Sequence, residues 1–352
     1  MLVRRDGETG LRQTHYLNGA VFGLAAATIW ASWSVLTRLA VTTGLDASDI
    51  AALRFGVAGL LLAPVVLRRG LARDRLGWPG LGVLVAGVGV PYVLIAATGL
   101  RFAPARDGGA LNPGCMPLFV ALLAAGVLRE KLSTARISGL SLILAGAVII
   151  IGWHAGGRWS ASRALGDGLF LTASFLTAGF TVVMRRAQLD PLHAVALVST
   201  GSLVVYLPIY FALHGARLAR IPLADLAVQA LFQGVVVTIL SLVLYGRAVA
   251  LLGAAAGSAF GALVPALAAL FAIPLLGEWP SQGDWAGIVL ISAGVYLASG
   301  GTLPRRVWHS AALSRGLCDY DSRATAVTTR EPSRRGAGRS RRATSRSRRH
   351  GG

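Results

Sequence analysis

The chain has 352 residues, of which 54% are hydrophobic and only 14% are charged, and its mean hydropathy is +0.63. A soluble domain carries about 25% charged residues because its surface faces water. The composition therefore excludes a soluble globular protein, a collagen-like fibre and a coiled coil, and it indicates an all-α integral membrane protein. Two cysteines, Cys115 and Cys318, are too few for a disulfide framework, which excludes a small secreted scaffold.

Transmembrane helices require nearly uncharged runs of about 20 residues to cross a hydrocarbon core of roughly 30 Å. The chain has ten such runs, each bounded by charged residues or by glycine and proline. We expect ten transmembrane helices at Leu17–Leu39, Ile50–Leu67, Leu81–Leu100, Gly108–Leu128, Ser133–Trp153, Gly166–Met184, Leu192–Leu213, Leu226–Leu251, Ala254–Leu276 and Gly283–Ser299. The second and tenth runs are short, and residues 246–257 can be divided differently, so nine helices is an alternative.

The distribution of lysine and arginine predicts the orientation, because cytoplasmic loops retain positive charge. With ten spans, the side that holds both termini carries twenty-six of the 34 basic residues, and the opposite side carries six. Thirteen of the twenty-six follow residue 302, and the bias persists without them. We therefore expect a multi-pass protein of the cell membrane with both termini in the cytoplasm.

Residues 109–152 and 257–300 form an internal repeat. A shift of 148 residues aligns fourteen identical pairs over 44 positions, among them Glu130 with Glu278. A repeat of five spans forces the second copy into the membrane upside down. The charges agree, because basic residues surround Glu130 and none lies near Glu278 in the sequence. The sequence thus predicts two inverted five-helix repeats.

The repeat divides the chain into five parts. We expect a cytoplasmic N-terminal segment at 1–16, the first repeat at 17–153, a linker at 154–165, the second repeat at 166–301 and a tail at 302–352. The tail holds thirteen Arg and three acidic residues, so we expect it to be disordered and cytoplasmic. Contact with anionic lipids is one possible role. We expect no nucleic-acid partner, because the tail has neither interleaved aromatic residues nor a folded module.

Both copies contain a glutamate followed by a glycine-containing helix. The residues that carry this pattern are Pro117, Glu130, Gly139 and Gly146 in the first copy, and Pro265, Leu275–Glu278, Gly287 and Gly294 in the second. The second span begins Ala-Ala-Leu-Arg-Phe at residues 51–55. With these motifs, residues 17–300 resemble the EamA-type permeases of the drug/metabolite transporter superfamily. The resemblance implies transport of small metabolites or drug-like solutes, more often export of amino acids or other metabolites than uptake.

The two copies depart from the family pattern at two positions. The first copy has Arg129 where a glycine is expected before the glutamate, and the second has Gly201 at the counterpart of Arg54. The second difference indicates that Arg54 has a role in one half only.

Polar and aromatic residues inside spans predict a substrate pocket, because hydrocarbon tolerates them only beside a cavity or a partner. Four recur at helical spacing in the first span: Trp30, Trp33, Ser34 and Thr37. Their equivalents in the sixth span, 147 residues later, are Thr177, Phe180, Thr181 and Met184. An inverted repeat places the two stripes on opposite walls of a central pocket. The alternative is that the tryptophans lie at the interface and the hydroxyls bond their own backbone.

Further candidate substrate-binding residues lie in the third, fourth and eighth spans. Tyr92 follows a proline in the third span, and Gln233 and Tyr245 lie in the eighth. Asn112 belongs to residues 107–114, a stretch so rich in helix breakers that its backbone must be buried or line water. The alternative for these side chains is hydrogen bonding between helices.

Two charged residues are candidates for contact with solute or ion. Arg54, near the outer end of the second span, is placed to meet an anionic group of a substrate, and snorkelling to the interface is the alternative. Asp107, at the outer mouth of the fourth span, is the candidate for coupling to a cation or proton, and a helix N-cap is the alternative. None of the acidic residues is central to a span, so we expect a facilitator or exchanger.

The glycines predict contacts between helices. Gly139 and Gly146 in the fifth span, and Gly287 and Gly294 in the tenth, have the same spacing of seven. We expect them to let these two helices approach closely, or to form the face of a homodimer.

Three functional classes compete. The leading hypothesis is a transporter that moves a small solute by alternating access, with membrane lipids and a small-molecule substrate as its partners. A membrane-embedded enzyme would need grouped His, Asp, Glu or Ser, and the six His are scattered, so we expect no enzyme, no cofactor and no metal. The third class is a non-transporting membrane interaction or sensory protein that acts through its basic tail.

Overall fold

The structure is a computed structural model. It describes residues 3–127, 129, 132–155, 160–215, 217–253 and 259–300, with the backbone alone at 3–15 and 154–155. Within these ranges the chain is helical and contains no strand. The predicted tail, together with Glu130 and residues 254–258 of the repeat, lies outside the described residues.

The described residues contain eight helical segments that are long and apolar enough to cross a membrane. These are α1 (Val3–Thr43), α2 (Ala47–Arg69), α3 (Arg73–Val88) continued by α4 (Val90–Phe102), α5 (Ala105–Val127), α6 (Thr134–Ala155), α7 (Ala161–Arg186), α8 (Pro191–His214), and α9 (Leu223–Ala230) continued by the π-helix η2 (Leu231–Leu240) and by α10 (Ser241–Leu252). The short 3₁₀-helix η3 (Phe260–Leu263) leads into α12 (Val264–Leu276), and α13 (Gln282–Ala298) follows. Each predicted span coincides with one of these segments. A multi-pass helical membrane protein is thus confirmed, while the number ten stays a prediction because α12 and α13 are short.

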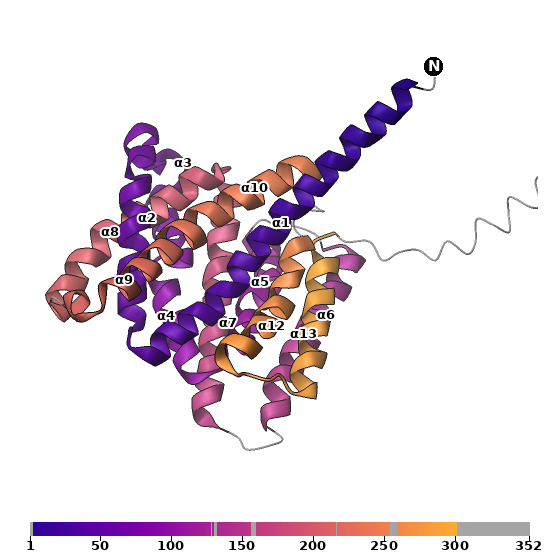
Figure 1. Ribbon diagram of the computed structural model, residues 1–352. Coiled ribbons are helices and arrows are strands. Elements are labelled where there is room, and N and C mark those ends of the chain that lie inside the picture. Colours follow the sequence, from indigo (N-terminus) through magenta and orange to yellow (C-terminus); the bar gives the residue numbers. More distant parts are fainter. Residues whose placement is uncertain are drawn as a thin grey trace, which may run out of the picture. The chain divides into compact units, whose positions relative to one another are not determined.

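Helices of the two halves pack against each other in exchanged pairs (Figure 1). The first span, α1, packs on α10, which belongs to the eighth. The sixth span, α7, packs in the same way on α3 and α4, which form the third. The second span packs on the seventh through α2 and α8, and the fifth packs on the tenth through α6 and α13. If each span is replaced by its equivalent in the other half, the same set of contacts results. Two equivalent copies require this symmetry.

The glycines of α6 and α13 show that the copies run in opposite directions. A Cβ atom on Gly139 would lie 2.7 Å from the carbonyl oxygen of Gly294, and one on Gly146 would lie 2.7 Å from that of Gly287. The first glycine of each pair therefore faces the second glycine of the other, so these equivalent helices are antiparallel. The predicted close approach is confirmed. This face is occupied within the chain itself, so the glycines are not a free surface for a second copy.

The turns after the fourth and ninth spans share one backbone conformation. Gly277 ends α12 with φ +66°, and Arg129, at the equivalent position after α5, has φ +54°. A left-handed conformation costs a residue other than glycine roughly 1–2 kcal/mol. The first copy therefore departs from the repeat in residue type and keeps its geometry.

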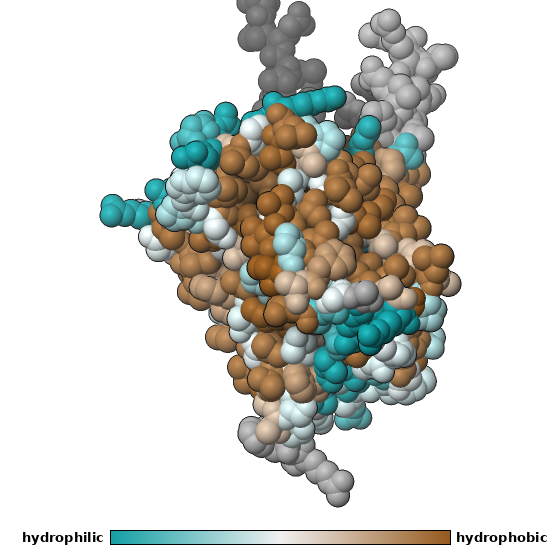
Figure 2. Space-filling model, turned by 90° about the vertical axis from the view of Figure 1, so that its left-hand side faces the viewer, coloured by the Kyte–Doolittle hydropathy of each residue, from teal (hydrophilic) through white to brown (hydrophobic). Residues whose placement is uncertain are grey.

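The lateral surface of the bundle is apolar. Large hydrophobic side chains are exposed on α2, α8 and α13, among them Leu60, Leu61, Val204, Val205 and Val289. Figure 2 shows one face on which hydrophobic residues predominate. Apolar patches of this extent on a monomer would associate in water, so this surface is suited to hydrocarbon.

The glycine contacts predict the stability of two matched variants. Gly294→Ala places a methyl group against the backbone of α6 and should lower the stability by about 1–3 kcal/mol, a typical cost of overpacking. Gly126→Ala is the control, because nothing lies within 4 Å of the added atom, and it should be neutral or slightly stabilising. Melting of the purified protein in detergent measures both. Equal melting temperatures would show that the close approach contributes nothing.

Candidate functional site

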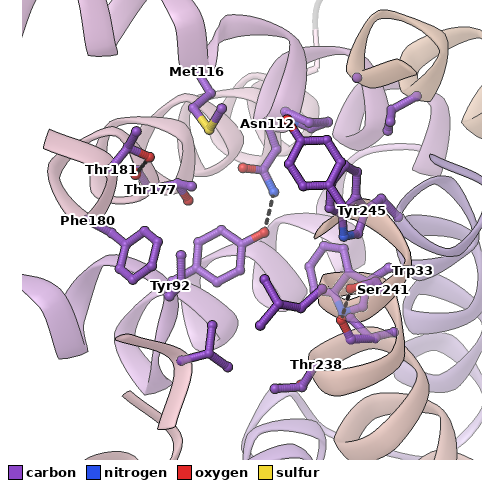
Figure 3. Close-up of a pocket in the computed structure, with 18 of the residues that line it drawn as sticks. Trp33, Tyr92, Asn112, Met116, Thr177, Phe180, Thr181, Thr238, Ser241 and Tyr245 are labelled. Atoms are coloured by element: carbon purple, nitrogen blue, oxygen red, sulfur yellow. Dashed lines mark hydrogen bonds between the residues drawn. The ribbon is translucent and has the colours of Figure 1, made fainter. Parts of the chain in front are cut away.

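A cavity of about 470 Å³ lies inside the bundle. Its walls contain eight of the nine predicted substrate-binding residues, which are Trp30, Trp33, Arg54, Tyr92, Asn112, Thr177, Phe180 and Tyr245. Figure 3 labels Trp33, Tyr92, Asn112, Thr177, Phe180 and Tyr245 in one view, with Tyr92 between Phe180 and Asn112. Substrate binding by these residues stays a prediction, but their side chains come together as the sequence pattern requires.

The two stripes of the repeat contribute equivalent positions to the cavity. Three lining residues come from α1, namely Trp30, Trp33 and Ser34, and their equivalents from α7 are Thr177, Phe180 and Thr181. Thr37 and its equivalent Met184 do not line the cavity. In both stripes the first three positions therefore line the cavity and the fourth does not. Both copies contribute to the site.

A buried amide fixes the orientation of Trp33. The indole Nε1–H of Trp33 donates a hydrogen bond of 3.0 Å to Oε1 of Gln233, and Nε2 of Gln233 donates one of 3.0 Å to Thr37. Gln233 is fully buried and does not line the cavity. Gln233, which the sequence predicted to bind substrate, thus lies behind the cavity wall. There it holds the side chain of Trp33, which is part of the wall.

A break in the third span determines the position of Tyr92. Gly89 separates α3 from α4 with ψ −149°, and a Cβ atom there would lie 2.6 Å from the hydroxyl oxygen of Ser202. Helix α4 then begins with Pro91 in its first turn, so Tyr92 projects from a helix start inside the membrane. The Tyr92 hydroxyl accepts a hydrogen bond of 3.0 Å from Nδ2 of Asn112, and its ring stacks on Trp33 at 6.1 Å between centroids (Figure 3).

The eighth span reaches the cavity through a π-helix that the sequence reasoning did not predict. In η2 the hydroxyl of Thr238 donates to the carbonyl oxygen of Gln233, five residues earlier, at 2.8 Å. The wider turn leaves Thr238 and Ser241 on the cavity wall. Further along, Tyr245 packs on Trp30 with 5.2 Å between ring centroids. Segments of π-helix often occur at functional sites, but nothing in the residue types of this run distinguishes it from an α-helix.

The sequence reasoning also missed the apolar part of the wall. Val88, Val195, Val198, Val264 and Val295 line the cavity. A valine on a cavity wall has the same sequence signal as a valine that faces lipid. Only the packing of the helices separates the two.

The cavity extends toward one end of the bundle. Its lining includes Ser299, which ends α13, and Gly261 in η3. Both lie at the predicted cytoplasmic end. Toward the predicted outer end the lining stops at Arg54, Phe55 and Asn112, about two turns inside the helices.

Glu278 lies at the predicted outer end, where it links several spans. Its carboxylate pairs with Arg38 of α1 and accepts a hydrogen bond of 2.8 Å from the backbone N–H of Ala105 at the start of α5. Arg38 also donates to the carbonyl oxygens of Leu100 and Ala103, the latter at 2.8 Å. One glutamate of the repeat motif thus joins the ends of three spans, an arrangement that the motif alone did not reveal.

A second ion-pair cluster lies at the same end and contains Asp107. Its Oδ2 accepts from Arg163 of α7 at 2.6 and 2.9 Å. Arg106 of α5 pairs with Asp284 of α13 at 3.1 Å. Asp107 is buried and does not line the cavity, so the structure places the predicted coupling residue in the closed end rather than at the site.

Comparisons with known proteins agree with this architecture. The EamA-like transporter family matches residues 17–152 and again residues 164–300. The chain belongs to the EamA-like transporter family. It is therefore a membrane transporter of small molecules.

Individual relatives match most of the chain or part of it. A probable terminal-alkyne amino-acid exporter of Streptantibioticus cattleyicolor is 30% identical over 82% of this chain and 96% of its own length. The aromatic amino acid exporter YddG of Ancylobacter novellus is 27% identical over 51% of this chain and 62% of its own. A crystal structure has a TM-score of 0.54 at 21% identity over 85% of this chain and 98% of its own, which supports the fold alone.

The closed outer end predicts the effect of removing one charge. Glu278→Gln should weaken closure by roughly 1.5–3 kcal/mol, the range for hydrogen bonds to charged groups, and so increase the open fraction about tenfold or more. The measurement is the labelling rate of Ser34→Cys by a membrane-impermeant maleimide from the predicted outer side, with Cys115 and Cys318 replaced by serine. Asp190→Asn is the control, because its pair with Arg69 is exposed. Equal rates in Glu278→Gln and the parent would remove the closing role of Glu278.

Proposed function

We propose that the protein exports a small amphipathic metabolite, such as an amino acid, by alternating access of its cavity to the two sides of the cell membrane. The observation that carries this proposal is the cavity itself. It takes equivalent residues from both repeats, extends toward one end and is closed by ion pairs at the other. In transporters built from inverted repeats, substrate sites lie near the bilayer midplane between the copies.

The similarity to amino-acid exporters supports the choice of cargo. The exporter of Streptantibioticus cattleyicolor is similar over most of its length. The cavity of about 470 Å³ lies within the 300–1,000 Å³ range typical of small-molecule sites. Its combination of apolar walls, aromatic rings and a few polar groups suits a solute with one polar and one apolar end.

Orientation follows from the basic residues. Arg68, Arg69 and Arg185 lie at the end toward which the cavity extends, and positive charge favours the cytoplasm. We infer that this conformation is open inward, with both termini in the cytoplasm. The coupling role proposed for Asp107 then acts through its ion pair with Arg163, which lies in the part that must open outward, and not through contact with cargo.

The orientation predicts the behaviour of reporter fusions. A green fluorescent protein after residue 352 should fluoresce, and alkaline phosphatase at the same position should be inactive, because the phosphatase requires export. Insertion of the phosphatase in the linker between α6 and α7 should give active enzyme. The reverse pattern of activities would show that the bundle is inserted the other way round.

The shared site predicts the effect of truncating its aromatic walls. Trp33→Ala and Phe180→Ala should each lower amino-acid flux in proteoliposomes about fivefold or more, because a lost aromatic contact weakens binding by on the order of 1 kcal/mol. Trp279→Ala is the matched control, since that side chain is 74% exposed outside the cavity. Unchanged flux in both wall variants, with intact folding, would contradict the location of the transport path.

A further inference from the structure

Arg54 is partly buried and has no ion-pair partner in the described part of the chain. Its side chain lines the cavity, and its Nε is buried with no hydrogen-bond partner. Its Cζ atom lies 5.7 Å from the centroid of the Phe55 ring. The side chain therefore faces the cavity, which favours contact with a solute over snorkelling to the end of the helix.

The carboxylates nearest to Arg54 in the sequence are engaged by other groups. Asp49 accepts from Arg217 at 3.1 Å and from the Tyr210 hydroxyl, and Asp46 pairs with Arg101 and Arg217. Arg54 belongs to neither network. Its charge therefore lacks the compensation that these neighbouring arginines receive.

Other arginines of the bundle follow the expected rule. Arg38 pairs with Glu278, Arg106 with Asp284, and Arg163 with Asp107. Removing a guanidinium from water costs free energy, and without a counter-charge no other interaction compensates for the lost hydration. Ionisable groups inside a membrane that lack such a partner mark substrate or ion pathways. Arg54 departs from this rule, and its side chain lines the cavity.

The rest of the cavity determines what that solute resembles. Among the described lining residues, Arg54 is the only side chain with a formal charge, and none is Asp or Glu. An anionic group has a counter-charge there, whereas a cation has none. In the same cavity, the rings of Trp33, Tyr92 and Phe180 offer flat apolar surface.

We propose that Arg54 binds the carboxylate of the cargo, so that the protein selects small organic carboxylates with an apolar body, amino acids included. This inference rests on the proposed transport function and names the substrate class of the same site. A guanidinium binds a carboxylate through two parallel hydrogen bonds, and the apolar body then lies on the aromatic wall. The ammonium group of an amino acid is not required.

Four small probes that share a phenyl ring test the proposal. L-Phenylalanine carries both charges, 3-phenylpropionate only the carboxylate, phenethylamine only the ammonium, and L-phenylalaninamide the ammonium with a neutral amide. Competition with counterflow of radiolabelled L-phenylalanine in proteoliposomes gives flux. Thermal stabilisation of the detergent-purified protein gives binding. The two carboxylates should compete at least tenfold better than the two amines.

Variants of Arg54 provide the second arm. Arg54→Gln should remove the preference for carboxylates, and Arg54→Lys should keep part of it, because lysine retains the charge without the planar pair of donors. Arg68→Gln is the matched control, an exposed arginine on the same helix. If Arg54→Gln does not fold, the probe series on the unmodified protein still decides the question.

Each outcome separates the inference from the transport proposal. Competition by phenethylamine equal to that by 3-phenylpropionate, or an unchanged preference in a folded Arg54→Gln protein, overturns the role of Arg54 and leaves transport standing. Carboxylate-selective binding that depends on Arg54, without flux, supports the binding site and contradicts transport of these solutes. If none of the probes binds or moves, both proposals fail for this class of cargo.

Discussion

Hydrocarbon offers no hydrogen-bond partner, and this constraint governs how most of the polar side chains discussed above are arranged. Threonine and serine hydroxyls donate to carbonyl oxygens of their own helices, as Thr177 and Thr181 do. Gln233 connects Trp33 to Thr37, and Asn112 donates to Tyr92. Interhelical hydrogen bonds in membranes contribute only about 0.6 kcal/mol on average, so their main effect here is on orientation. They hold two aromatic rings against a cavity while the surface outside stays apolar.

Close backbone approach supplies the packing that polar groups do not. Besides the glycines of α6 and α13, Gly59 lies against the backbone of α8, and Gly87 accommodates the Cβ atom of Phe180. Between helices in lipid the hydrophobic effect provides little attraction, so van der Waals contact at small residues takes its place. The Gly87 contact is the one that reaches the site. It allows α7 to lie close enough to α3 for Phe180 to join the cavity wall.

The fold could be predicted largely from the sequence, because hydropathy, basic loops and an odd-numbered repeat each reflect the bilayer directly. The aromatic stripes were predictable for the same reason, since tryptophan and threonine are conspicuous inside a span. Gln233 was predicted to bind substrate and Asp107 to take part in coupling. The sequence shows that a polar residue within a span needs a partner, but it does not show which partner. The valine wall and the π-helix carry no such signal. The role of Glu278 was hidden too, because its partners Arg38 and Ala105 are distant in sequence and meet only in the folded bundle.

The repeat explains both what the two ends share and where the site is unequal. Arg38 and Glu278, which form an ion pair at one end, correspond in sequence to Arg185 and Glu130, which the sequence prediction assigns to the opposite end. An inverted duplication therefore supplies each end with an arginine and a glutamate that can form an ion pair and close it, as the proposed alternation requires. Arg54 breaks this equivalence, since Gly201 occupies its counterpart. Symmetric residues suit the parts of a transporter that must exchange roles between states. A cargo with distinct polar and apolar ends needs a site whose two halves differ, and a single arginine on one wall supplies that difference.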